Sequence, residues 1–388
     1  MSGSEAEAPR LGSRQSVLPT YARAPVTIVR GEGCRVWDDA GRGYLDFGAG
    51  IAVVTLGHCA QGPAAAAHAQ LDRLWHASNL YWTEPMVELA GLLTDRLGGG
   101  AAFFCNSGAE ANEAALKYAR KATGRTRVVA LEGGFHGRTL GALSATGQPA
   151  KWTGFGPLVP GIAFARPNDV ESLERALAPA GDTALVLLEP ILGEGGVVPL
   201  ERGFAEAAAE RAREIGALLC VDEVQAGCGR TGTFFAFEQL GLEPDLVTLA
   251  KGLANGLPMG ALLVGPHAAT GFEPGDHGST FGGNPVAAAA ACAVVQELDE
   301  ALLASVRDRG ARLVAGLSSL PAVLEVRGRG LLLGATLDRP VAGVVDACRD
   351  RGLLVLSAGP EVLRLTPPLV VCDAEVDEAL AVLGEVLK

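Results

Sequence analysis

Residues 218–225 read Leu218-Leu219-Cys220-Val221-Asp222-Glu223-Val224-Gln225, an apolar run of strand length that ends in two acids and a glutamine. Similar apolar runs stand at Ala184–Leu188 and Leu246–Leu249. Segments of helical period, rich in Ala, Leu and Glu, separate such runs from about residue 49 to residue 266. This alternation is typical of a mostly parallel sheet covered by helices on both faces, so the sequence predicts an α/β fold.

Further segments flank this region on both sides. Val26–Val29 and Arg35–Trp37 are expected to pair as a hairpin across a glycine-containing turn. After Asn284, an Ala-rich helix leads to a strand at Val323–Val326. A closing βαβ-like pattern then ends in an amphipathic helix. These segments predict a second, smaller α/β unit.

The length of 388 residues favours more than one domain. We expect a large domain at residues 48–270 and a small domain made of residues 16–47 with residues 275–388. Residues 1–15 are expected to be a disordered tail, since they lack the apolar core of a signal peptide.

Composition excludes several classes of function. A net charge of −12 without a basic patch argues against nucleic acid. The longest apolar run, Val286–Val295, is about half as long as a membrane span requires, so no membrane partner is expected. Eight cysteines are scattered without C-x-x-C or histidine spacing, which favours a cytoplasmic protein without a metal site.

The segment Asn106-Ser107-Gly108-Ala109-Glu110 lies between an apolar run at Ala101–Cys105 and a helical stretch at Ala111–Ala122. Ser107 and Glu110 form an S-x-x-E capping box. A helix N-terminus with a glycine beside its cap exposes free N–H groups, which makes it a candidate phosphate site. The alternative is an ordinary helix cap.

Two further positions carry candidate chemistry. Asp222 stands at the carboxyl end of a predicted strand, where ligands bind in open α/β sheets. If it faces a pyridine nitrogen, its charge keeps that nitrogen protonated, and Gln225 can bond a ring hydroxyl. Lys251 follows the apolar run Leu246–Ala250, so burial can lower its pKa and leave a nucleophilic amine. The alternatives are an acidic surface loop and a solvated lysine.

A competing pattern lies between these two positions. Gly227-Cys228-Gly229-Arg230-Thr231-Gly232 fits G-x-G-x-x-G, with Asp245 further along, which suggests a dinucleotide site. The acids and Gln225 separate the strand from the glycines, and Thr233–Phe237 is a poor start for a phosphate-facing helix. The dinucleotide interpretation is therefore disfavoured.

Taken together, seven segments resemble the class III, ornithine-type aminotransferases of the fold-type I pyridoxal-phosphate superfamily. The resemblance spans nearly the whole chain after the tail. The segments are Asn106–Glu113, Phe135–Thr139, Glu189–Gly196, Asp222–Gln225, Gly229–Gly232, Lys251–Gly252 and Gly278–Pro285.

The resemblance implies pyridoxal 5'-phosphate as the cofactor and assigns residues to it. Lys251 is implied to bind it covalently and to move protons, and Asp222 to pair with the ring nitrogen. The remaining cofactor-binding positions are Ser107, Gly108, Ala109, Phe135, His136, Gln225 and, from the other subunit of a homodimer, Thr280. We expect His136 to be structural rather than a general base.

Substrate positions are implied in the same way. Arg138 matches an arginine that clamps a carboxylate, with a surface ion pair as the alternative. Arg364 and Glu194 resemble a switch that opens to accept the α-carboxylate of 2-oxoglutarate or glutamate. Ser279 is the remaining substrate-binding candidate.

The expected reaction moves the terminal amino group of N2-acetylornithine to 2-oxoglutarate, as in arginine biosynthesis. Alternatives with the same chemistry use ornithine, 4-aminobutyrate, succinylornithine or an acyl-diaminopimelate as the donor. An NAD-dependent oxidoreductase and a non-catalytic pyridoxal-binding protein are the rivals from other classes.

Overall fold

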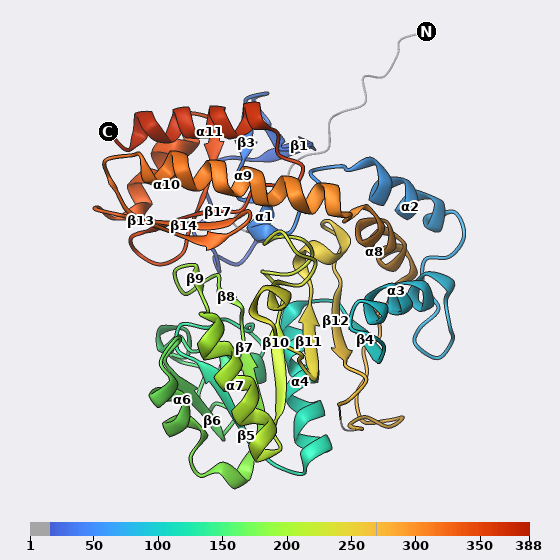
Figure 1. Ribbon diagram of the computed structural model, residues 1–388. Coiled ribbons are helices and arrows are strands. Elements are labelled where there is room, and N and C mark those ends of the chain that lie inside the picture. The colour runs from blue at the N-terminus through green and yellow to red at the C-terminus, as the bar shows by residue number, and fades with distance from the viewer. Residues whose placement is uncertain (1–15, 269) are drawn as a thin grey trace.

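A sheet of seven strands forms the centre of the structure (Figure 1). The computed structural model describes residues 16–268 and 270–388, so the tail predicted at residues 1–15 lies outside the described residues. Neighbouring strands from β11 to β6 run parallel, whereas β12 runs antiparallel to both of its neighbours. The mostly parallel sheet of the predicted α/β fold is thereby confirmed. Across the sheet the order is β4 (Ala101–Cys105), β12 (Gly260–Val264), β11 (Leu246–Leu249), β10 (Leu218–Asp222), β7 (Thr183–Leu188), β5 (Arg127–Leu131) and β6 (Ile162–Ala165).

Successive residues of the central strands enter two separate apolar cores. Leu219 and Val221 pack in the core that includes α7 (Arg202–Ile215), whereas Cys220 packs in the core beneath α4 (Gly108–Thr123). Both faces of the sheet are therefore covered, which explains why its strands are apolar throughout rather than alternating. The helices α5 (Leu140–Ala145) and α6 (Val170–Leu177) also pack beside this sheet. Short 3-10 helices lie at Pro149–Lys151, Ala180–Asp182, Ala236–Leu240 and Lys251–Ala254.

Two four-stranded sheets lie beyond the carboxyl ends of the central strands (Figure 1). One has the order β1 (Ile28–Glu32), β2 (Arg35–Asp38), β3 (Gly43–Asp46) and β15 (Leu353–Leu354). The other has the order β13 (Val323–Arg329), β14 (Leu332–Leu337), β17 (Val362–Leu365) and β16 (Leu356–Ser357). A two-stranded ribbon pairs β8 (Ile191–Leu192) with β9 (Val198–Pro199).

The predicted hairpin is confirmed, because β1 and β2 pair antiparallel. The predicted closing βαβ-like pattern is present in split form, because β14 and β16 both pair antiparallel with β17 between them and therefore run parallel to each other. β14 and β17 pair antiparallel, and the intervening β15 joins the other sheet, parallel to β3. The apolar runs alone did not distinguish these pairings, because residues of both sheets pack in one continuous core. Three helices pack with these sheets: α9 (Glu300–Ser318), α10 (Val341–Arg349) and α11 (Asp373–Val386).

The Ala-rich helix predicted after Asn284 is α8 (Pro285–Glu297). It packs against α2 (Gln61–Leu71) and α3 (Glu84–Asp95), as Figure 1 shows at the right. Small alanine side chains permit this close approach of helices. The division into domains at residues 48–270 and at residues 16–47 with 275–388 stays a prediction.

A left-handed turn, α1 (Ala49–Ala52), connects β3 to the central unit. Its φ angles are 45° at Ala49, 62° at Gly50, 68° at Ile51 and 60° at Ala52. This backbone costs a β-branched residue such as Ile51 roughly 1–2 kcal/mol, so the surroundings must hold it. Asp46 accepts bonds from the N–H groups of Gly48 and Ala49 at 3.0 and 2.9 Å, which fixes the start of the turn.

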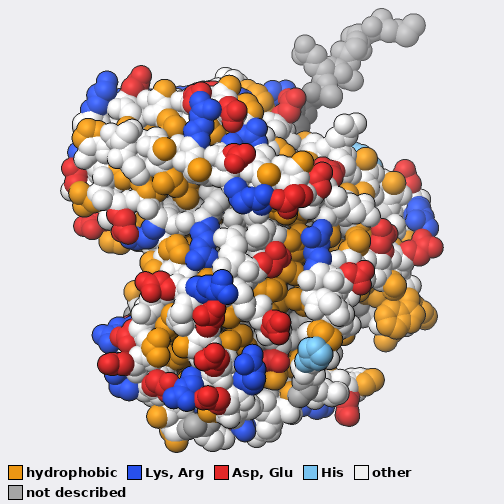
Figure 2. Space-filling view, viewed as in Figure 1, with side chains coloured by type: hydrophobic (Ala, Val, Ile, Leu, Met, Phe, Trp, Pro, Cys, Tyr) orange, Lys and Arg blue, Asp and Glu red, His pale blue; other side chains and the backbone are white. Residues whose placement is uncertain are grey.

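Basic and acidic side chains are intermixed on the face drawn in Figure 2. Hydrophobic side chains gather at its right edge, where Figure 1 places the segment between α2 and α3. The large apolar residues exposed in this segment include Trp75, Leu80, Tyr81 and Trp82. Within the described residues, no helix combines the length and apolar character that crossing a membrane requires.

Candidate active site

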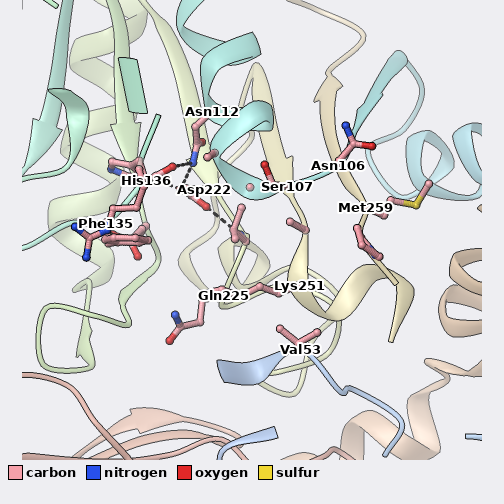
Figure 3. A pocket seen from close by; sticks show the side chains of 18 of the residues that line it. Val53, Asn106, Ser107, Asn112, Phe135, His136, Asp222, Gln225, Lys251 and Met259 are labelled. Atoms are coloured by element: carbon pink, nitrogen blue, oxygen red, sulfur yellow. Dashed lines mark hydrogen bonds and ion pairs between the residues drawn. The ribbon is translucent and has the colours of Figure 1, made fainter. Parts of the chain in front are cut away.

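A cavity of roughly 390 Å³ opens at the carboxyl ends of β10 and β11 (Figure 3). The N-terminal end of α4 borders it, at the edge where open α/β sheets bind ligands. The structure brings nine of the predicted site residues to its lining: Ser107, Gly108, Ala109, Phe135, His136, Arg138, Asp222, Gln225 and Lys251.

Lys251 begins a 3-10 helix directly after β11 and Ala250. Burial lowers the pKa of its amine to about 8, although the nearby carboxylates of Glu194, Asp222 and Glu189 favour the charged form. Its backbone has a φ of 43°, in the left-handed region. The buried amine therefore has a larger neutral fraction near neutral pH than an exposed lysine has.

Asp222 ends β10 and is 3% exposed. Its Oδ2 accepts a hydrogen bond from Asn112 Nδ2 at 2.7 Å and lies 2.7 Å from His136 Nδ1 (Figure 3). Its Oδ1 accepts from the Val224 N–H at 2.9 Å. Thr248 extends the network by donating to Asn112 Oδ1 at 2.9 Å. Asp222 is therefore fixed in orientation at the end of its strand.

His136 is 3% exposed. Burial is the largest single effect and lowers its pKa, but the bond to Asp222 and the charges of Asp222 and Glu189 together raise it more, so the net shift is upward. Asn112 Nδ2 also donates to the His136 carbonyl at 2.9 Å, which ties α4 to the segment before α5. These bonds fit the structural role expected for His136.

The N-terminus of α4 forms one wall of the cavity, with Ser107 as its N-cap. Ser107 Oγ accepts from the Glu110 N–H at 3.2 Å, so half of the predicted capping box is present. The other half is wrong, because the Glu110 carboxylate accepts from the backbone N–H of Asn106 rather than of Ser107. A Cβ at Gly108 would lie 2.7 Å from the Val224 side chain, so this close approach requires glycine.

Arg364 and Glu194 form an ion pair beside Gln225. Arg364 Nη1 donates to Glu194 Oε1, to the Gly193 carbonyl at 2.9 Å and to Gln225 Oε1 at 3.0 Å. Burial alone would raise the pKa of Glu194, but the guanidinium holds it below its usual range. Arg364 is 3% exposed, so these acceptors stabilise a guanidinium that is almost entirely removed from water.

Arg138 is exposed and lines the cavity, with its guanidinium 5.7 Å from the centroid of the Phe135 ring. Ser279 and Thr280 do not line this cavity. They lie at a second cavity of roughly 530 Å³, which shares Asn106 with the first. Ser279 Oγ accepts from Asn106 Nδ2 at 3.1 Å.

The glycine-rich loop at residues 227–232 packs against residues of the C-terminal part of the chain. Arg230, 2% exposed, donates to the carbonyls of Leu331 and Pro367. A Cβ at Gly229 would lie 2.9 Å from Leu369, and one at Gly232 would lie 2.4 Å from Arg307. These glycines serve close packing rather than a phosphate, which removes the support for a dinucleotide site.

Sequence reasoning missed two buried polar residues of the site, Asn112 and Glu189. Asn112 lies within the segment Asn106–Glu113. The feature that could have indicated a role for it was a single amide among the small, apolar residues of the predicted helix. Glu189 follows the apolar run Ala184–Leu188, and its signal was the same as that of Asp222, an acid at a strand end. Glu189 Oε2 accepts from the Phe135 N–H at 2.7 Å.

Comparison with known proteins gives consistent results. The model of the family described as Aminotransferase class-III matches residues 18–387. The acetylornithine aminotransferase of Thermosynechococcus vestitus is 48% identical, over 96% of this chain and 95% of that protein.

Solved structures agree with this match. The N-acetylornithine aminotransferase of Stenotrophomonas maltophilia has a TM-score of 0.82 at 40% identity, covering 94% of this chain and 96% of that one. An ornithine aminotransferase from Toxoplasma gondii, with partial occupancy of PLP at its active site, has a TM-score of 0.92 at 34% identity. That match covers 96% of this chain and 92% of the other.

Proposed function

Because this chain belongs to the class-III aminotransferases, we propose that it moves the terminal amino group of N2-acetyl-L-ornithine to 2-oxoglutarate. The products are N-acetyl-L-glutamate 5-semialdehyde and L-glutamate, and the step belongs to arginine biosynthesis. The chain is a transaminase, and its cofactor is pyridoxal 5'-phosphate. One observation carries the proposal: an amine of lowered pKa, a buried aspartate and a helix N-terminus line one cavity.

The residues of the cavity fit the cofactor. Lys251 offers an amine for covalent attachment, and Asp222 offers a fixed carboxylate for the ring nitrogen. The N-terminus of α4, at Ser107–Ala109, offers backbone N–H groups and a positive dipole end for the phosphate. When bound, pyridoxal phosphate supplies a ring that accepts the electron pair released when a C–H bond beside the donor nitrogen breaks.

In this proposal the protein's own residues bind, orient and move protons. Lys251 Nζ takes the proton from the donor carbon and returns it at the cofactor carbon. Phe135 would pack against one face of the ring, and Gln225 would lie near the ring oxygen. Asp222 keeps the ring nitrogen charged, since an adjacent carboxylate favours protonation.

Two arginines divide the recognition of substrates. Arg138, exposed at the cavity, is placed to hold the carboxylate of the amino donor. Arg364 is held by Glu194 and Gln225 until a dicarboxylate displaces the glutamate side chain. One pocket can then accept both the donor and 2-oxoglutarate.

A homodimer with shared sites is part of the proposal. Thr280 and Ser279 lie outside the cavity of their own chain but beside a second cavity that shares Asn106 with it. The exposed Trp75, Tyr81 and Trp82 offer apolar surface for a subunit contact. Thr280 of the second subunit would then reach the phosphate. A cytoplasmic location stays a prediction from the sequence.

Ornithine is the second candidate donor, because the Toxoplasma gondii structure named an ornithine aminotransferase superposes with a TM-score of 0.92. A panel of donors at fixed 2-oxoglutarate tests the choice: N2-acetylornithine, ornithine, succinylornithine, 4-aminobutyrate and an acyl-diaminopimelate. We expect the highest kcat/KM with N2-acetylornithine. A higher value for another donor would replace the substrate, and no conversion with any amine would reduce the protein to a pyridoxal-binding protein.

A further inference from the structure

Glu189 is a buried acid of the cavity to which the proposed chemistry gives no role. It follows β7 directly and is 6% exposed. Its Oε2 accepts from the Phe135 N–H at 2.7 Å, which fixes where the carboxylate points. A buried charge of this kind needs a partner or a proton.

His136 lies on the other side of Gly134. An ideal Cβ built at Gly134 would lie 3.3 Å from Glu189 Oε2 and 3.4 Å from His136 Nε2. Both atoms therefore face the same small volume, which glycine leaves open. His136 Nε2 has no hydrogen-bond partner within residues 16–268 and 270–388, although it is buried. The Nδ1 atom of the same ring is already engaged with Asp222.

The charges around this pair come from three elements. Asp222 on β10 and Glu189 after β7 face His136 from its two sides, and the Lys251 amine after β11 is the other charge near Glu189. Burial raises the pKa of Glu189, and the histidine opposes that rise. The pKa of His136 is raised as well, with both carboxylates favouring the imidazolium. The two groups are therefore coupled: a charged Glu189 favours the imidazolium, and the imidazolium favours a charged Glu189.

We propose that Glu189 is a positioning residue: its carboxylate faces His136 Nε2 across Gly134, stabilises the charged imidazolium and so sets the charge of the Asp222–His136 pair. With the proton on His136, the pair is neutral in sum. When Glu189 is protonated it no longer stabilises the imidazolium, and beside a neutral His136 the Asp222 carboxylate keeps its full negative charge toward the cofactor ring. Glu189 therefore acts on the ring nitrogen through His136 and Asp222, without touching it.

The link to the ring rests on the proposed function, because it takes Asp222 as the partner of the ring nitrogen. The link between Glu189 and His136 does not depend on any substrate. A measurement on the imidazole therefore separates failure of this inference from failure of the donor assignment.

The test uses Glu189→Gln in the cofactor-loaded enzyme. The glutamine oxygen can still accept from the Phe135 N–H, but the carboxylate charge is gone. Nitrogen NMR of labelled histidine side chains, assigned with His136→Gln, follows the protonation of His136 with pH. We expect its pKa to fall by roughly one unit or more, as on loss of a neighbouring opposite charge. The pH midpoint of the bound cofactor's visible absorbance should move in the same variant.

Glu223→Gln is the matched control. Glu223 is a second buried acid beside Asp222, but its carboxylate accepts from the N–H groups of Ala236 and Phe237 at 3.0 and 2.8 Å. This control should leave His136 unshifted. Gly134→Ala, which fills the volume between the two groups, is the second variant and should also lower the pKa of His136. An imidazole that titrates as in the wild type, or an absorbance midpoint that stays in place, would overturn the proposal.

Discussion

Replacing Lys251 by methionine in the cofactor-free protein should stabilise the fold, and the gain should depend on pH. The amine has an ordinary pKa of 10.5 in the unfolded chain, and burial lowers it to about 8 in the folded protein. Below pH 8 the folded protein must keep a charged ammonium inside the cavity. Methionine has similar length and no charge, so it removes this cost.

The sign and size follow from proton linkage. Between pH 8 and pH 10.5 the unfolded chain binds a proton that the folded protein does not, so the stability of the wild type rises with pH there. The full interval corresponds to roughly 3 kcal/mol, at about 1.4 kcal/mol per pKa unit. The variant should therefore gain about 3 kcal/mol below pH 8. This pH-dependent gain should vanish above pH 10.5.

Urea unfolding of both proteins, stripped of cofactor, measures the difference from pH 6.5 to pH 10.5. Lys388→Met removes an exposed ammonium and is the control for the loss of a lysine charge outside the cavity. A stability gain in Lys251→Met that stays constant across this range would refute the reasoning, because it would show that the amine is solvated as in the unfolded chain.

Three further predictions concern the neighbours of Lys251. Asn112→Ala removes a donor to Asp222 and leaves the Thr248 hydroxyl and the His136 carbonyl without their partner, so urea unfolding should show a loss of roughly 3 kcal/mol; a loss below about 0.5 kcal/mol would contradict the network. Glu194→Gln frees Arg364 from its ion pair, so competitive inhibition by a dicarboxylate should tighten by roughly tenfold, whereas an unchanged inhibition constant would remove the switch. Gly108→Ala drives a methyl group into Val224 and should weaken cofactor binding by roughly tenfold in an absorbance titration. Gly91→Ala, in open space on α3, is its control, and equal affinities in the two variants would contradict the tight fit.

Much of the central sheet could be predicted from the sequence, because its strands are apolar on both faces. The runs around Leu185, Leu219 and Val247 are strands β7, β10 and β11. Because β12 is also apolar on both faces, its sequence does not indicate whether it pairs parallel or antiparallel with its neighbours. The antiparallel strand β17, which is inserted between the two parallel strands of the βαβ-like pattern, was not predicted for the same reason.

The left-handed backbone at Ala49–Ala52 could not be predicted from the sequence, for a different reason. Left-handed φ angles at Ile51 and its neighbours oppose local preference and depend on bonds from distant residues. Thr366, for example, donates to the Gly48 carbonyl at 2.9 Å across most of the chain. Such contacts have no signature in the local pattern.

The candidate site was partly predictable. Asp222 and Lys251 were found from their positions after apolar runs, where the sheet geometry places side chains at one edge. Asn112 and Glu189 were missed because their roles depend on which side chains they meet. The hydrogen bond from Asn112 to Asp222 joins residues far apart in the chain, and only the fold brings them together.

The account depends on one attachment: pyridoxal phosphate bound through the Lys251 amine, with Asp222 at the opposite end of its ring. Borohydride reduction of the loaded protein, followed by peptide mass mapping, locates the attachment directly. We predict the added mass on the peptide that contains Lys251 and its loss in Lys251→Met. Attachment at Lys117, Lys121, Lys151 or Lys388, or at no lysine, would contradict the account.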